Sequence, residues 1–482
     1  MNLSLLTDFY ELTMMQGYFF NCPQDRGVFE MFFRRQPFQG GYTVFAGLGP
    51  LLEALEGLRF TGEEIAYLDS RGIFKKEFLD YLAGFRFRGD VFSVPEGTAV
   101  YPNEPLVRVR GNLMEAQMVE SMLLNFINFQ SLIATKTARI VSIAGNGPVM
   151  EFGLRRAQGT DGALSAARAA FIGGASSTSN TLAGKEYGIP VSGTMAHSWV
   201  MKFDSELEAF RKYAAMYPDR CVLLVDTFDT LKSGIPNAIA VFRELREKRP
   251  SLMAVRIDSG DLEYLSKKAR AMLDDGGLPE VKIFVSSDLD EWIMRQLIDS
   301  GAPIGGWGVG TRLVTGWNDP ALTGVYKIVA TNRGETFDPR IKISNQAEKI
   351  TNPGVKNIMR FYNDRGQALA DLIYLEEEEG DLEALIARRA PVRFNHPATD
   401  YSHFTLSDYA SVKKLLVPVM EEGRAIGAGP SLKEIQEYRR QEVDTLDKTY
   451  RRLLNPHIYK ISLSDRLKKL KTDMIRLIRD NY

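Results

Sequence analysis

The feature that most constrains the fold of this chain is a series of short apolar runs that recurs from residue 148 onward. The runs lie roughly 20–30 residues apart with helical stretches between several of them, which is the spacing of βα units in a parallel sheet. We expect a strand in each of seven runs: PVMEF (148–152), AAFIG (169–173), IPVSG (189–193), CVLLV (221–225), LMAVRI (252–257), VKIFV (281–285) and PIGGW (303–307). Periodicity alone does not distinguish a closed barrel from an open sheet.

Each predicted strand is followed by small, polar or charged residues. In a parallel barrel these carboxyl ends lie on one face, where active sites are built. Any one of these segments is also compatible with an ordinary turn or helix cap. Taken together they gather charged groups and a glycine loop on one face: Arg155, Arg156, His197, Asp226, Arg256, Asp258, Asp288 and GVGTRLVTG at 308–316.

Length and charge set broad limits on the class of protein. A chain of 482 residues is expected to form two or three domains. Its 60 Lys and Arg residues balance 61 Asp and Glu residues, so the formal charge of −1 carries no global signature of a nucleic-acid or membrane binder.

The two cysteines, Cys22 and Cys221, form no disulfide framework and no cysteine-based zinc site. Asp8 and Glu11 interrupt the apolar N-terminal stretch, which has no basic segment before it, so we expect no signal peptide. No run of about 18 uncharged apolar residues predicts a membrane-spanning helix. We expect a cytoplasmic protein.

Outside the series of runs, the pattern predicts a helix over 7–20 capped by Thr7, a small antiparallel β-unit over 85–113, and helical structure over 113–144. Beyond residue 340 the regular spacing of apolar runs ends. The segment LEEEEGDLEALIARRAP (375–391) indicates a solvated turn followed by a helix. Residues 431–482 have helical spacing, and their Lys and Arg residues are expected to form a solvated helix face.

Several groups at the predicted strand ends suit a phosphorylated sugar. Asp258 can accept hydrogen bonds from two sugar hydroxyls, while Arg256, with Arg155 on the same face, can pair with phosphate. Gly308 and Gly310, with the hydroxyl of Thr311, allow backbone N–H groups to approach a phosphate. Asp226 and Asp288 can hold water ligands of Mg²⁺, which often binds through substrate phosphates.

His197 is the only histidine in the first 395 residues. An isolated histidine is often a hydrogen-bonded structural residue, but histidine is also the usual acid, base or nucleophile near neutral pH. Its place after a predicted strand, beside the other charged groups, favours a functional role.

A set of longer motifs resembles the nicotinate phosphoribosyltransferase family, of the type II phosphoribosyltransferases. The motifs follow one order over residues 7 to about 330: TDFYELTM (7–14), FEMFFRRQPFQGGY (29–42), EGTAVYPNEPLVRV (96–109), EFGLRRAQG (151–159), GGASSTSN (173–180), GIPVSGTMAHSWV (188–200), RIDSGD (256–261), SSDLDE (286–291), GVGTRLVT (308–315) and GVYKIVA (324–330). The tail, PSLKEIQEYRRQEVDTL (430–446), also looks like the family's C-terminal region.

The resemblance implies an α/β fold: an irregular seven-stranded α/β barrel with an N-terminal α/β sandwich-like domain and a helical C-terminal region. The expected boundaries are 1–140 for the sandwich-like domain, 141–340 for the barrel and 341–482 for the C-terminal region, which partly completes the sandwich. The implied reaction joins nicotinate and phosphoribosyl pyrophosphate, with ATP hydrolysis, to give nicotinate mononucleotide. It makes the enzyme an ATP-coupled ligase of NAD biosynthesis that uses Mg²⁺ and acts as a homodimer with shared sites.

The resemblance also implies roles for individual residues. His197 would be the histidine that ATP phosphorylates, a nucleophile towards the phosphoryl group. Phe152 would stack on the pyridine ring opposite Tyr10 of the other subunit. Arg155 would lie near substrate phosphate or carboxylate, Asp258 would hold the ribose, and Gly308, Gly310 and Thr311 would hold the 5′-phosphate. Further phosphate contacts from the partner are expected of Arg34, Arg35 and Lys327.

Three alternatives stay open. A nicotinamide-specific enzyme profits from a carboxylate that accepts the amide N–H₂, whereas GGASSTSN offers hydroxyl and amide groups, Ser177, Ser179 and Asn180 among them, which favours nicotinate. A barrel that only senses phosphorylated metabolites needs no phosphoryl acceptor such as His197. A different phosphosugar enzyme on the same barrel is compatible with the architecture alone.

Overall fold

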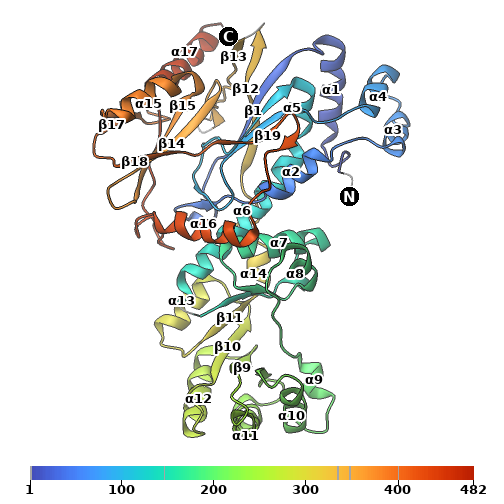
Figure 1. The fold of residues 1–482 in the computed structure, drawn as a ribbon, viewed down its shortest axis with the longest axis vertical. Coiled ribbons are helices and arrows are strands. Elements are labelled where there is room, and N and C mark those ends of the chain that lie inside the picture. Colours follow the sequence, from blue (N-terminus) through green and yellow to red (C-terminus); the bar gives the residue numbers. More distant parts are fainter. Residues whose placement is uncertain (1–2, 146, 334–335, 347–348, 400, 482) are drawn as a thin grey trace. The chain divides into compact units, whose positions relative to one another are not determined.

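The computed structural model describes residues 3–145, 147–333, 336–346, 349–399 and 401–481 (Figure 1). Its internal contacts divide the chain into two compact units. Unit 1 comprises the described parts of 1–132 and 321–482, and unit 2 is residues 133–320, inserted between them. The domain boundaries at 140 and 340 that the sequence suggests stay a prediction.

Unit 2 is built on a six-stranded sheet in which every paired neighbour is parallel. The spatial order is β7 (Ser177–Thr178), β6 (Val149–Glu151), β11 (Gly306–Val309), β10 (Lys282–Ser287), β9 (Leu252–Ile257) and β8 (Arg220–Leu224). The described residues leave β7 and β8 as the two ends of this sheet, so a closed seven-stranded barrel is not confirmed.

Helices connect the strands of unit 2, as the spacing predicts. They are α7 (Gly159–Gly173), α8 (Thr181–Tyr187), α9 (His197–Met201), α10 (Glu206–Met216), α11 (Ile235–Arg246), α12 (Leu262–Asp275), α13 (Glu291–Asp299) and α14 (Thr311–Val314), with short helical turns at Leu154–Arg156 and Thr230–Gly234. Helices α10 to α12 pack against β8, β9 and β10 and bury one face of these strands (Figure 1).

Two of the seven predicted strands are corrected by the structure. AAFIG at 169–173 is the end of α7, because its alanines continue a buried helical face that stops at Gly174 in a left-handed conformation (φ 108°). The strand of that unit is the shorter β7. IPVSG at 189–193 forms a single parallel bridge between Val191 and Thr178 rather than a ladder. The other five runs overlap β6, β8, β9, β10 and β11, although PIGGW shares only Gly306 and Trp307 with β11.

Unit 1 contains two larger sheets. The seven-stranded sheet has the order β13 (Thr336–Pro339), β12 (Gly324–Arg333), β1 (Arg26–Phe33), β5 (Val107–Asn112), β3 (Asp90–Ser93), β19 (Val417–Glu421) and β20 (Arg424–Ala425). The six-stranded sheet has the order β17 (His403–Leu406), β16 (Val392–Asn395), β21 (Ile461–Leu463), β15 (Ala368–Leu375), β14 (Lys356–Tyr362) and β18 (Ser411–Lys414). A small pair joins β2 (Thr43–Val44) to β4 (Ala99–Val100).

The helices of unit 1 come from both ends of the chain. They are α1 (Phe9–Asn21), α2 (Leu48–Glu56), α3 (Gly62–Asp69), α4 (Lys76–Ala83), α5 (Leu113–Met118), α15 (Glu379–Ala387), α16 (Leu432–Asp444) and α17 (Asp465–Asn481), with short turns at Pro37–Gln39 and Glu376–Glu378. Helix α6 (Glu120–Ile143) crosses from unit 1 into unit 2. No helix in the described part of the chain is long and apolar enough to cross a membrane.

Most of the elements predicted for unit 1 are confirmed, with two corrections. The β-unit over 85–113 contains β3, β4 and β5, and the helical stretch over 113–144 contains α5 and α6. Thr7 does not cap the first helix: Asp8 is the capping position, and the Thr7 hydroxyl donates to Glu11 instead. The segment 431–482 is not one helical region, since β21 separates α16 from α17.

A fully buried ion cluster connects the N-terminal and C-terminal parts of unit 1. Arg360 of β14 donates through Nε and Nη2 to Asp371 of β15, at 2.9 and 2.7 Å, and through Nη1 to Glu442 of α16 at 3.1 Å. Its Nη2 also donates to the carbonyl of Ala99 in β4 at 2.7 Å, and the Tyr459 hydroxyl donates to Asp371 at 2.9 Å. These bonds give the buried guanidinium hydrogen-bond partners in place of water. Removing Arg360 or one of its carboxylate partners would therefore leave a buried charge without its counter-charge.

We predict that Arg360→Ala lowers the free energy of unfolding by about 3–5 kcal/mol, because Asp371 would keep a buried charge without a cationic partner and Glu442 would keep only Lys413, at 2.9 Å. The measurement is urea unfolding followed by circular dichroism. Arg440→Ala is the matched control: Arg440 lies on α16 in an exposed pair with Glu437, and its loss is expected to leave the free energy of unfolding nearly unchanged because water screens the pair. Equal effects of the two substitutions would contradict this account.

Candidate active site

The carboxyl ends of the parallel strands in unit 2 bring the predicted site residues to one edge. In the ladder, Arg256 of β9 lies beside Phe284 of β10, and Ser286 of β10 lies beside Gly308 of β11. Side chains alternate between the two faces of a strand, so Phe284 and Ser286 share a face of the sheet. Asp258 follows β9 directly, at the same edge.

A cavity of about 240 Å³ lies at this edge. Three arginines, Arg155, Arg156 and Arg256, line it together with two carboxylates, Asp258 and Asp288. The remaining wall is made by Phe152, Ser286, Ser287, Gly308, Gly310 and Thr311. Eight of the predicted site residues therefore meet in one pocket of unit 2. The excess of arginine over carboxylate in its wall suits an anionic ligand.

Gly308 has a steric reason for being glycine. A Cβ atom added there would lie 2.7 Å from the ring of Phe152 and 3.1 Å from the Cβ of Ser286. The bare backbone therefore lets the Phe152 ring lie directly over β11. Phe152 also lines the pocket, where an aromatic ring can stack on a flat ligand.

Arg256 is the most enclosed cation of the pocket. Its Nη1 donates to the Thr194 hydroxyl at 2.6 Å, whereas its Nε is buried without a hydrogen-bond partner among the described residues. Burial lowers the pKa of Arg256, and Asp258 and Asp226 oppose that shift. A buried guanidinium with an unused donor fits an anion in the cavity.

Asp258 is held from two directions. The Ser286 hydroxyl donates to its Oδ1, and Asp226 anchors the backbone because its Oδ2 accepts the Asp258 N–H at 3.0 Å. The same Oδ2 accepts the Ser259 hydroxyl at 2.6 Å. Asp226 thus positions the loop rather than lining the cavity, and its Oδ1 is buried without a hydrogen-bond partner in the described chain.

His197 begins α9 and lies beside this loop. Its Nδ1 is 3.2 Å from the Thr227 hydroxyl, and its Nε2 is 3.9 Å from Oδ2 of Asp258. The side chain remains 42% exposed, so the imidazole is oriented by Thr227 and still accessible to a reactant. His197 and Asp258 are therefore neighbours in space although 61 positions separate their numbers.

Ser177, Ser179 and Asn180 do not line the arginine-rich cavity. Ser177 lines a second hollow of about 750 Å³, whose wall also includes Phe152 and Arg256. Ser179 uses its backbone N–H to bond the Glu151 carbonyl at 2.9 Å. Asn180 is buried and caps α8, since its Oδ1 accepts the Ala183 N–H at 3.2 Å. A substrate contact by these three residues stays a prediction.

The remaining predicted residues belong to unit 1. Tyr10 and Lys327 both approach Glu120: the Lys327 Nζ lies 3.8 Å from its Oε1, and burial together with Glu120 raises the pKa of Tyr10. The backbone N–H groups of Arg34 and Arg35 both donate to the Thr323 hydroxyl at 3.3 Å. Unit 1 thus gathers these four residues into two small groups of its own.

Three hydroxyl residues that orient the site escaped sequence reasoning: Ser286, Thr227 and Thr194. Ser286 stood within the SSDLDE motif directly after a predicted strand, so its position was a usable signal. Thr194 directly follows the IPVSG run and Thr227 lies two residues after CVLLV, so both had the same positional signal, but their partners depend on distances between separate loops. Glu151 was also missed. It is buried at the end of β6, accepts the Thr178 hydroxyl at 2.5 Å, and has its pKa raised by burial.

The fit of Mg²⁺ to this site can be judged from its carboxylates. Within the described residues, no group of three or more His, Cys, Asp or Glu side chains is arranged to hold a metal ion. Asp258, Asp288 and the unused oxygen of Asp226 provide hard oxygen atoms near the arginines. This set fits Mg²⁺ carried mainly by ligand phosphates and their waters, not a metal caged by protein alone.

Fold and site together define an α/β protein whose parallel sheet presents a cationic pocket, with an aromatic wall, at its strand ends. Three protein-family models match successive parts of the chain. The nicotinate phosphoribosyltransferase N-terminal domain matches residues 5–128, the family's central model matches 148–365, and its C-terminal domain matches 355–471.

Individual relatives cover nearly the whole chain. Nicotinate phosphoribosyltransferase of Bacillus subtilis is 43% identical over 96% of this chain and 93% of its own, and that of Caenorhabditis elegans is 35% identical over 96% and 92%. The crystal structure of human nicotinic acid phosphoribosyltransferase has a TM-score of 0.81 at 30% identity and covers 97% of this chain and 99% of that one. The chain belongs to the nicotinate phosphoribosyltransferase family.

Proposed function

We propose that this protein is a nicotinate phosphoribosyltransferase of NAD biosynthesis by salvage of nicotinate. The reaction converts nicotinate, phosphoribosyl pyrophosphate, ATP and water to nicotinate mononucleotide, pyrophosphate, ADP and phosphate. The observation that carries the proposal is the pocket that combines Phe152, three arginines and Asp258 at the strand ends. Membership of the family supports it.

The pocket provides the groups that the transfer step needs. The pyridine nitrogen forms a bond to the anomeric carbon as the bond to pyrophosphate breaks, and the electron pair leaves with the pyrophosphate. Arg155, Arg156 and Arg256 neutralise that leaving group, and Asp258 accepts hydrogen bonds from the ribose hydroxyls. Phe152 holds the pyridine ring by stacking. When bound through the phosphates, Mg²⁺ adds positive charge at the leaving group.

The irregular seven-stranded barrel is part of the same proposal. Segment 189–193 is the candidate for the seventh strand. Thr178 donates its N–H to the Pro190 carbonyl at 3.0 Å, and Ser192 donates its N–H to the Thr178 carbonyl at 3.0 Å. These bonds extend the sheet beyond β7 in the parallel sense. A cytoplasmic location is likewise proposed, and the free thiols of Cys22 and Cys221 suit a reducing compartment.

We predict that kcat/KM for nicotinate exceeds that for nicotinamide by at least about tenfold, a difference of roughly 1.4 kcal/mol in transition-state binding. The reason is the excess of arginine over carboxylate in the pocket, which favours an anionic substrate. The assay compares nicotinate, nicotinamide and quinolinate with phosphoribosyl pyrophosphate, each with and without ATP. Equal or better use of nicotinamide would reverse the assignment and favour the amide-specific alternative.

We also propose that ATP phosphorylates His197. The γ-phosphoryl group passes to an imidazole nitrogen, ADP leaves, and water later releases phosphate. The exposure of the ring and its contact with Thr227 support this role, because the nucleophile is both accessible and oriented. A barrel that only senses metabolites would have no use for such a step.

We predict that His197→Gln folds normally but loses ATP hydrolysis and binds phosphoribosyl pyrophosphate poorly, while slow ATP-independent turnover survives. Intact enzyme incubated with labelled ATP should carry an acid-labile, base-stable phosphate that the variant lacks. His403→Gln is the matched control, since His403 is an exposed histidine of β17 in unit 1. Normal ATP hydrolysis by His197→Gln would show that this histidine is structural.

A homodimer with shared sites completes the proposal, with Tyr10, Arg34, Arg35 and Lys327 expected to serve the partner's pocket. These residues belong to unit 1, whereas the pocket belongs to unit 2, so the site's residues are divided between two parts of the chain.

We predict that mixing inactive Tyr10→Ala with inactive Asp258→Ala restores part of the activity. Each heterodimer would have one intact site of two. Random exchange of subunits makes about half of the dimers heterodimers, so the expected maximum is about a quarter of the wild-type rate. Turnover is measured after subunit exchange has been verified with differently tagged chains. Absence of recovery after verified exchange would contradict a shared site.

A further inference from the structure

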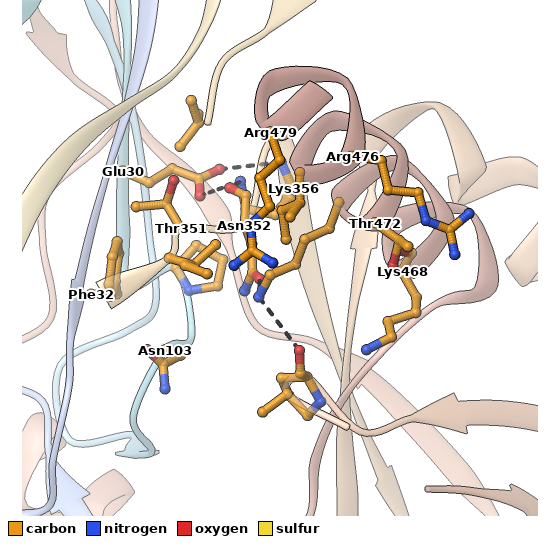
Figure 2. Close-up of a pocket in the computed structure, with 17 residues that line it drawn as sticks. Glu30, Phe32, Asn103, Thr351, Asn352, Lys356, Lys468, Thr472, Arg476 and Arg479 are labelled. Atoms are coloured by element: carbon orange, nitrogen blue, oxygen red, sulfur yellow. Dashed lines mark hydrogen bonds and ion pairs between the residues drawn. The ribbon is translucent and has the colours of Figure 1, made fainter. Parts of the chain in front are cut away.

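Unit 1 contains a cavity of about 360 Å³ that the proposed reaction does not use (Figure 2). One wall is a face of α17, and the opposite walls come from β1, β12 and the segment 350–356 before and at the start of β14. This volume is within the range of small-molecule sites. Every lining residue belongs to unit 1, so the cavity is separate from the pocket of unit 2.

The charge of the cavity wall is strongly positive. Lys356, Lys468, Lys471, Arg476 and Arg479 line it, and Glu30 is the only carboxylate among its described lining residues. Glu30 is already paired, since its Oε2 lies 3.0 Å from the Nζ of Lys356 and both side chains are almost completely buried. Lys471, Arg476 and Arg479 of α17 therefore line the cavity without a carboxylate from its described wall, while the Nζ of Lys468 donates to the His396 carbonyl at 3.2 Å.

The spacing on α17 explains why these cations gather. Positions 468, 471, 476 and 479 are three, five and three residues apart, which keeps them within one broad face of a helix. Figure 2 shows Arg479 reaching towards Asn352 and Lys356, while Arg476 is directed away from that group. Lys468 and Lys471 are half-buried, so the sequence-based expectation of a merely solvated face is wrong for these two, whereas Arg479 is exposed as expected.

Lys471 is the central cation of this face. Its Nζ donates to the Asn352 side-chain carbonyl at 2.8 Å and lies 3.5 Å from the Pro397 carbonyl. Burial and the neighbouring charges of Lys468 and Lys356 lower the pKa of Lys471 to about 8. An ammonium that is partly desolvated beside like charges gains stability when an anion binds next to it.

The rest of the wall offers neutral contacts. Phe32, Val329, Ile350 and Ile475 provide apolar surface, and Thr472, Asn103 and Asn352 provide hydroxyl and amide groups. This combination suits a ligand with a multiply charged anionic end and a compact, less polar remainder. Arginine and lysine pair with phosphate oxygens through charge-assisted hydrogen bonds.

We propose that the α17 cavity binds a small metabolite that carries two or more linked phosphate groups. Lys471 and Arg479 neutralise the phosphates, Thr472 and Asn352 orient them, and the apolar wall accommodates a nucleoside when one is attached. The site is a second phosphate site of the chain, distinct from the pocket at the strand ends of unit 2.

The test uses the full-length protein and two probes without added metal, sodium tripolyphosphate and ATP. Hydrogen exchange is read separately in peptides covering 350–357 and 465–481 and in peptides covering the strand ends at 256–261 and 286–291. Both probes are expected to protect the first pair of peptides. Stronger protection by ATP would mean that the nucleoside contacts the apolar wall, and equal protection that phosphate alone is recognised.

Arg479→Glu is the diagnostic variant, because the side chain is exposed enough for charge reversal without loss of folding. In this variant, the tripolyphosphate concentration that half-protects peptides covering 465–481 should rise about tenfold, as expected for loss of a charge-assisted contact. Lys469→Glu is the matched control: it makes the same charge change on α17, outside the cavity wall, and should leave the affinity within about twofold.

Arg155→Ala separates this proposal from the proposed function, since it should alter protection at the strand ends and leave that of 465–481 unchanged. The α17 site is overturned if neither probe protects 465–481, or if Lys469→Glu weakens protection as much as Arg479→Glu. Loss of the α17 effect in Arg155→Ala would also overturn it, because the signal would then come from the pocket of unit 2.

Discussion

The parallel alignment of β6, β11, β10 and β9 is the constraint on which the candidate active site depends. Parallel strands end at the same edge, so residues that follow different strands approach one another. Arg256, Ser286 and Gly308 come from three consecutive strands and line one cavity. An antiparallel sheet would have sent the ends of neighbouring strands to opposite edges.

Within that edge, the functional groups are oriented by short polar contacts rather than by the strands themselves. Asp226 holds the backbone of Asp258, Ser286 holds its carboxylate, and Thr227 orients His197. Gly308 contributes by leaving room for the ring of Phe152. The arrangement keeps cations, a carboxylate and an aromatic face fixed before any ligand arrives, which lowers the reorganisation that binding requires.

Unit 1 contains two groups of charged side chains that differ in how their charges are balanced. The two carboxylates that Arg360 contacts, Asp371 and Glu442, each have a cationic partner, and the cluster connects β4, β14, β15 and α16. Along α17 the balance is different, because several cations face a cavity whose one described carboxylate is already paired with Lys356. Arg360 finds its counter-charges within the chain, whereas we propose that an anion supplies them along α17.

The sequence by itself determined the alternation of strands and helices in unit 2, the types of side chain at its strand ends, and the family. Apolar periodicity located five of the seven predicted runs on strands, because alternation and spacing are local properties of the chain. AAFIG was misassigned since five apolar or small residues suit a buried helix end as well as a strand, and only the packing of α7 distinguishes them. Tertiary structure alone decided which groups meet. Ser286 contacts Asp258 and Lys471 contacts Asn352, across 28 and 119 residues of chain, and such distances depend on how whole elements pack.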